Sequence, residues 1–107
     1  MKKFFVQPTE IKAVFADLQT TPEGVEIIGA PKVWGRSKKG SGIVIAVIDS
    51  GCDVNHPDLK DNIIGGYNFT NDDGGNKNIF RDYLGHGTHV SGIIAASDND
   101  KGIVGVA

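Results

Sequence analysis

The sequence has one cysteine, few aromatic residues and no long apolar run. With Cys52 alone, no disulfide bond can form within the chain. No apolar stretch approaches the roughly 20 residues that a membrane-spanning helix needs. Near the start, residues 4–6 are the only apolar run before Gln7, against the roughly 7–15 apolar residues of a signal-peptide core. We therefore expect a cytoplasmic globular chain with no membrane partner.

Acidic and basic residues are unevenly divided along the 107 residues, a length that suffices for one small domain. Residues 1–40 contain seven Lys or Arg against four Asp or Glu, whereas residues 41–107 contain four against nine. An acidic region repels phosphate backbones and suits hard cations, so we expect no nucleic-acid partner. A solvated surface that binds nothing would have the same charge balance.

Hydrophobic spacing predicts several short helices. Residues 9–18 have apolar side chains at helical intervals on one face. Residues 20–24 contain proline and glycine and are typical of a linker. Residues 30–35 suit one or two helical turns, with proline near the start and glycine at the end. A further helix is predicted from residue 86 to about residue 96.

The remaining apolar segments predict strands. Residues 43–48 form a continuous branched apolar run between glycine and aspartate, which is typical of a strand covered on both faces in a parallel sheet. Weaker strands are predicted for residues 63–69 and 103–107, with a long surface loop over residues 70–84. An order of strand, loop, helix and strand indicates an open α/β sheet.

Asp49 directly follows the predicted strand of residues 43–48. In open α/β sheets, catalytic groups gather at the carboxyl ends of strands, so the position suits a functional carboxylate. A capping or turn aspartate fits the same pattern. An acid that binds a ribose in a nucleotide-binding domain also fits, although no G-x-G-x-x-G precedes it.

His86 stands at the start of the predicted helix, among small residues, in G-H-G-T-H-V-S-G. A general base needs its imidazole exposed to a cleft while a carboxylate fixes the tautomer through the other nitrogen. A structural histidine is one alternative, and a zinc site with His89 is another. Zinc-binding helices usually space their histidines four apart with a glutamate between them, which disfavours zinc here.

Three motifs, in this order, resemble the aspartate and histidine blocks of the subtilisin-like serine proteases. They are V-I-D-S-G at residues 47–51, H-P-D-L at 56–59 and G-H-G-T-H-V-S-G at 85–92. The resemblance is strongest to the intracellular subtilisins, on details such as Gly51-Cys52. It implies an α/β fold: an open parallel sheet with helices on both faces, of which only the N-terminal part is present. Residues 1–18 would be an N-terminal extension and residues 19–107 the first part of the catalytic domain.

The resemblance implies that Asp49 is the acid and His86 the general base of a Ser-His-Asp triad in a serine endopeptidase. The family's nucleophilic serine and oxyanion-hole asparagine belong to later motifs that this chain lacks, so we expect residues 1–107 alone to be inactive. Ser50 is either a hydrogen-bonding support for Asp49 or a turn hydroxyl. His89 is expected to pack or hydrogen-bond on the inner face of the helix. The implied partners are peptide or protein substrates, the remainder of the catalytic domain, and a second copy in a homodimer of the complete enzyme.

A Ca²⁺ site is also implied by the resemblance. Its ligands would be the side chains of Gln19, Asp58 and Asn99 and the backbone carbonyls of Ser97, Lys101 and Ile103. An acidic surface loop is the alternative, and a non-catalytic calcium-binding or regulatory fragment of the same fold is the alternative function.

The resemblance implies, in addition, that residues 1–18 lie across the active site and block it, with Pro8 hindering cleavage. The alternative for this stretch is a frayed terminus followed by a packing helix.

Overall fold

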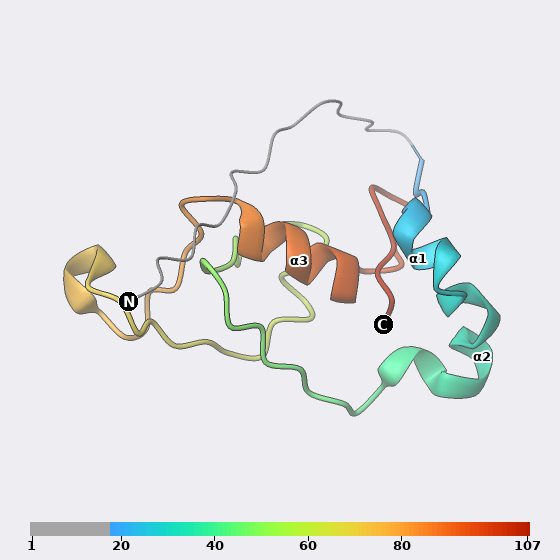
Figure 1. Ribbon diagram of the computed structural model, residues 1–107, viewed down its shortest axis with the longest axis horizontal. Coiled ribbons are helices and arrows are strands. Elements are labelled where there is room, and N and C mark those ends of the chain that lie inside the picture. Colours follow the sequence, from blue (N-terminus) through green and yellow to red (C-terminus); the bar gives the residue numbers. More distant parts are fainter. Residues whose placement is uncertain (1–17) are drawn as a thin grey trace, which may run out of the picture.

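The computed structural model describes residues 18–107, which form short helices joined by irregular chain (Figure 1). The elements in chain order are α1 (Glu23–Ile27), η1 (Ala30–Lys32), α2 (Trp34–Ser37), η2 (Lys38–Gly40), η3 (Asp72–Gly75) and α3 (His86–Ala95). In this part of the chain, no helix is long and apolar enough to cross a membrane. The helix predicted for residues 9–18 lies outside the described residues except for Leu18, which is in a bend.

The predicted C-terminal helix is confirmed as α3, which begins at His86 and ends at Ala95. Gly85 precedes it with φ 82°, a left-handed conformation that glycine adopts without steric cost. The last turn is held by the returning chain end. There, Val106 N–H donates to the Ile93 carbonyl at 2.9 Å. The helix that carries His86 is therefore anchored at its far end by backbone hydrogen bonds.

The helices before residue 41 differ in their bounds from the predicted ones. The linker predicted for residues 20–24 ends early, because α1 begins at Glu23, directly after Pro22. Proline suits the start of a helix because its fixed φ and missing N–H cost nothing there. The turns predicted for residues 30–35 correspond to η1 and α2, but α2 passes through Gly35 and ends at Ser37.

The predicted open parallel sheet is not confirmed. Within residues 18–107, β-type pairing is confined to one isolated parallel bridge between Thr20 and Ile103. Residues 43–48 and 63–69, both predicted as strands, run as irregular chain. A strand needs a neighbour that pairs with its N–H and C=O groups in a ladder. In the described part of the chain neither segment has such a ladder, and residues 63–69 make only a single backbone hydrogen bond, from Asn68 N–H to the Lys77 carbonyl at 2.9 Å.

Residues 43–48 and 63–69 border one hollow of about 810 Å³, together with parts of α3 and of the loop after residue 70. Ile43 and Val44 are 74% and 72% exposed, although consecutive residues of a strand would point to opposite faces. Both sides of the run are therefore uncovered in this structure. Few apolar side chains of residues 18–107 are buried: Val25, Ala30, Leu59, Ala96 and Val104.

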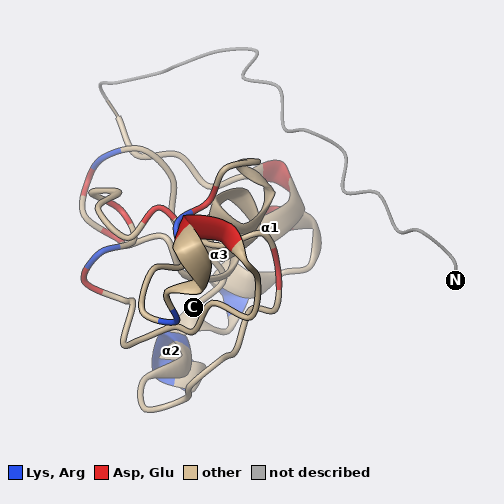
Figure 2. Cartoon of the chain, turned by 90° about the vertical axis from the view of Figure 1, so that its left-hand side faces the viewer, with Lys and Arg blue, Asp and Glu red and all other residues tan. Residues whose placement is uncertain are grey.

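Charged residues are distributed mainly over the loops (Figure 2). The long loop predicted for residues 70–84 is confirmed apart from the short turn η3. Lys39, in η2, forms an ion pair with Asp98 in the loop after α3, and its Nζ lies 4.7 Å from the centre of the Trp34 ring. The basic first part of the chain thus contacts the acidic second part.

Candidate active site

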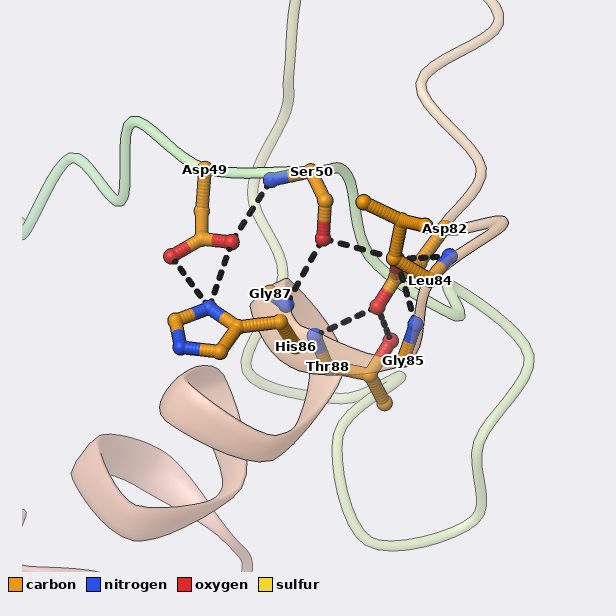
Figure 3. Close-up of polar contacts among 8 residues, drawn as sticks. All are labelled: Asp49, Ser50, Asp82, Leu84, Gly85, His86, Gly87 and Thr88. Atoms are coloured by element: carbon orange, nitrogen blue, oxygen red, sulfur yellow. Dashed lines mark hydrogen bonds and ion pairs between the residues drawn. The ribbon is translucent and has the colours of Figure 1, made fainter. Parts of the chain in front are cut away.

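Asp49 and His86 meet at the N-terminus of α3, although 37 residues separate them in the sequence. His86 Nδ1 lies 2.9 Å from Asp49 Oδ1 and 3.0 Å from Oδ2 (Figure 3). The Asp49 side chain is 15% exposed and the His86 side chain 38%. The carboxylate is therefore mostly enclosed, while the imidazole remains open to solvent.

The protonation state of Asp49 determines the tautomer of His86. Burial alone would raise the pKa of Asp49, but hydrogen bonds from His86 and from the Ser50 backbone N–H outweigh burial and lower the pKa below its usual value. Asp49 is then ionised at neutral pH and only accepts hydrogen bonds. Nδ1 must carry the proton, which leaves Nε2 with a free lone pair. This arrangement suits a general base.

Two glycines, Gly51 and Gly87, allow the backbone after Asp49 to contact the backbone of α3 directly. A Cβ on Gly87 would overlap the Gly51 carbonyl oxygen, and one on Gly51 would overlap the backbone at Arg81. Gly51 also has φ 115°, which favours glycine. The small residues around His86 therefore admit a neighbouring backbone.

Asp82 is a site residue that the sequence analysis missed. Its carboxylate accepts five hydrogen bonds, from the Ser50 hydroxyl, the backbone N–H groups of Leu84, Gly85 and Thr88, and the Thr88 hydroxyl (Figure 3). Burial would raise the pKa of Asp82, but these hydrogen bonds, with those from Thr88 the largest, lower it to about 2. The local signal was an aspartate two and three residues before N–H groups at a helix start, which is typical of a capping turn.

Ser50 and His89 differ from their predicted roles. The Ser50 hydroxyl donates to Asp82 Oδ1 at 2.8 Å and accepts from Gly87 N–H at 2.9 Å, so it supports the site through Asp82. The direct bond to Asp49 comes from the Ser50 backbone N–H instead, at 2.7 Å. Within the described residues His89 is exposed, so it does not pack on an inner helix face there.

No serine hydroxyl within the described part of the chain is hydrogen-bonded to His86 Nε2. Ser50, the serine next to Asp49, is already engaged by Asp82 and Gly87. The pair of Asp49 and His86 thus has the acid and the base of a proton-transfer system, with Nε2 available for a further group.

The residues predicted to bind calcium gather at the opposite end of α3. Gln19 Oε1 accepts the N–H groups of Asn99 and Asp100, both at 2.7 Å. Asn99 Nδ2 donates to Asp58 Oδ1 at 2.9 Å, and Ser97 N–H donates to the Asp58 carbonyl at 2.8 Å. The structure therefore brings together Gln19, Asp58, Ser97 and Asn99 from three separated stretches of chain.

The side chains of this cluster include oxygen donors of the kind that binds Ca²⁺. Asp58 is a carboxylate that is only 8% exposed, and amide oxygens accompany it, which are ligands that Ca²⁺ prefers. Asn99 presents its amide nitrogen to Asp58, while its Oδ1 accepts Lys101 N–H at 3.1 Å. A 180° rotation of the amide would present oxygen to the site and would break the bond from Lys101. Lys101 and Ile103 lie in the same loop, where Ile103 bridges to Thr20. The carboxylate and amide oxygens of this cluster are donor types that Ca²⁺ accepts.

The chain matches the Subtilase family over residues 40–107, which include Asp49, Asp82 and His86. This match covers more than half of the sequence. The protein therefore belongs to the subtilase family, as the motifs predicted.

The chain is similar to several named members of that family. It is 56% identical over 91 residues to the major intracellular serine protease of Bacillus subtilis, a match that covers 85% of this chain and 28% of that protein. It is 51% identical over 106 residues to an intracellular serine protease of Paenibacillus polymyxa, covering 99% of this chain and 32% of that protein. Subtilisin DY of Bacillus licheniformis is 42% identical over 89 residues, 83% of this chain and 30% of that protein. The chain thus spans about a third or less of the length of these relatives.

Proposed function

We propose that this chain is the N-terminal portion of an intracellular subtilisin-like serine endopeptidase. The observation that carries the proposal is the hydrogen-bonded pair of Asp49 and His86, with the imidazole side chain 38% exposed. Two similar relatives are named intracellular serine proteases, which supports both the reaction and the location.

In the proposed reaction, His86 Nε2 takes the proton of a serine hydroxyl as the serine oxygen attacks the carbonyl carbon of a peptide bond. Asp49 holds the Nδ1–H and stabilises the imidazolium that forms. The imidazolium then gives its proton to the leaving amine, and the C–N bond breaks to leave an acyl-enzyme. A water molecule, deprotonated by the same Nε2, hydrolyses the ester and restores the serine.

The serine and the oxyanion-hole donor of this reaction would come from a longer polypeptide. We propose that its further residues also cover the exposed run of residues 43–48, whose unbroken apolar character suits a strand covered on both faces. Without a nucleophile and an oxyanion hole, the base has nothing to activate and the transition state has no electrostatic support. Residues 1–107 alone should therefore not hydrolyse peptides.

The test is turnover of a chromogenic peptide by the polypeptide extended through the family's serine motif. Replacing His86 with alanine should lower kcat/KM by at least about 10³-fold, because triad residues contribute orders of magnitude to the rate. Residues 1–107 by themselves should give no turnover. Near-equal activity of the wild-type enzyme and its H86A variant would contradict the assignment.

We also propose Ca²⁺ as a structural ion of the complete protein, held by Gln19, Asp58 and Asn99 with backbone carbonyls of the loop from Ser97 to Ile103. The ion would stabilise the fold by binding the native state alone. The gathering of these groups from three stretches supports the proposal. The prediction that residues 1–18 inhibit the enzyme rests on the sequence, because residues 1–17 lie outside the described part of the chain.

A further inference from the structure

Asp82 connects the two segments that carry the triad residues. Its Oδ1 accepts the Ser50 hydroxyl at 2.8 Å, and Ser50 is the residue after Asp49. Its Oδ2 accepts both the backbone N–H of Thr88, at 2.8 Å, and the Thr88 hydroxyl, at 2.7 Å. Thr88 lies two residues after His86 in the first turn of α3. One carboxylate thus hydrogen-bonds both to the segment that carries Asp49 and to the helix that carries His86.

Other contacts extend the same junction. The Ser50 hydroxyl, oriented by Asp82, accepts from Gly87 N–H at 2.9 Å. The Thr88 hydroxyl, also oriented by Asp82, accepts from Asp53 N–H at 2.9 Å. Each hydroxyl has one proton, and both protons point to Asp82, so each oxygen is left to accept an N–H from the opposite segment. Losing the carboxylate would therefore disorder both of these cross-links.

The anion suits its place at the helix start. Residues at the N-terminus of a helix have N–H groups without intrahelical partners, and a negative charge is stabilised there. Asp82 accepts Leu84 N–H at 3.0 Å and Gly85 N–H at 2.9 Å, in addition to Thr88 N–H. All five donors point to the carboxylate, and the low pKa of Asp82 keeps it an acceptor at neutral pH.

We propose that Asp82 is a positioning residue of the active site, whose carboxylate sets the distance and angle between Asp49 and His86 through Ser50 and Thr88. This inference rests on the proposed function of the Asp49–His86 pair. Asp82 touches neither the substrate nor the reacting atoms, and it acts on the rate through the geometry of the proton-transfer pair.

The sharpest variant is Asp82→Asn in the complete enzyme. Asparagine keeps the shape of the side chain, but an amide nitrogen would face the Thr88 donors or the Ser50 donor. We expect kcat to fall about 10- to 100-fold with little change in KM, since a misplacement of about 1 Å costs about that much in rate. In addition, the fraction of His86 in the Nδ1–H tautomer, measured by ¹⁵N NMR of the imidazole, should decrease.

The control is Asp73→Asn, in the same long loop. Asp73 accepts from Tyr83 and pairs with Arg81, and within residues 18–107 it forms no side-chain hydrogen bond or ion pair with Asp49, Ser50 or α3. Its kcat should stay within about twofold of the wild type. All rates are divided by the concentration of active sites, titrated with an irreversible serine-directed inhibitor, so that loss of folded protein is not counted as loss of rate.

The Ser50→Ala variant keeps the proposal testable if the Asp82 variant does not fold. It should lower kcat per active site about 3- to 10-fold, and it should add little to the effect of Asp82→Asn, because both changes act through one network. Unchanged kcat per active site and tautomer fraction in the Asp82 or Ser50 variant would overturn the proposal. An active His86→Ala enzyme would instead refute the proposed function itself.

Discussion

For the replacement of Gly87 with alanine, the structure predicts a loss of stability, whereas helix propensity alone predicts a gain. It is buried and is the second residue of α3. In an ordinary helix, replacing glycine with alanine gains about 1 kcal/mol. Here the new Cβ would overlap the Gly51 carbonyl oxygen and lie 3.1 Å from the Gly51 nitrogen and 3.2 Å from its carbonyl carbon.

The overlap is with backbone atoms, so no side-chain rotation can relieve it. Overpacking of this kind costs about 1–3 kcal/mol. We expect a value near the upper end of this range, because the atoms overlapped belong to the Gly51 backbone. After the gain in propensity, we expect Gly87→Ala to lower the free energy of unfolding by about 1–2 kcal/mol. The loop at Gly51 must also move away from α3, which separates Asp49 from His86. A shift of about 1 Å would lower kcat about 10²-fold.

The assay is urea unfolding together with peptide hydrolysis, both on the complete enzyme. The control is Gly24→Ala, because Gly24 is likewise the second residue of its helix, α1, and a Cβ there meets nothing within 4 Å. Gly24→Ala should be neutral or stabilising and should retain wild-type kcat. The reasoning would be refuted if the two variants were equally stable and equally active.

Three further predictions concern the charge network, the ion site and the extension. The pKa of Asp82 is lowered to about 2 from 3.8, so its ionised form stabilises the fold at pH above about 4, and this contribution of at most about 2 kcal/mol is lost as the pH falls toward 2. In urea unfolding measured across this range, the free energy of unfolding should fall less steeply with decreasing pH in Asp82→Asn than in the wild type. The thermal midpoint of the complete protein should be higher with Ca²⁺ than with a chelator, and Asp58→Ala should abolish the difference; equal midpoints in the wild type would contradict the site. Deletion of residues 1–18 should raise peptide hydrolysis, and unchanged activity would show that the extension is not an inhibitor.

Much of the site could be predicted from the sequence because its signals are local. The helix from His86 was predicted to within a residue, since Gly85 before it and the spacing of apolar residues within it act over a few positions. The pairing of Asp49 with His86 followed from the resemblance of their motifs to a known family. The helical turns after Ala30 were also predicted, although proline and glycine set their bounds less strictly than expected.

The strands and the support of the triad could not be predicted in the same way, because they depend on groups distant in the sequence. The composition of residues 43–48 favours a strand, but a strand forms only beside a partner, and none pairs with this run within residues 18–107. The sequence by itself determined which residues could be acid and base, and where their helix begins. Only the tertiary structure decided that the Ser50 hydroxyl donates to Asp82, which lies 32 residues away in the sequence. A hydroxyl has a single proton to donate, and the fold places the Asp82 carboxylate, rather than that of the adjacent Asp49, within reach of it.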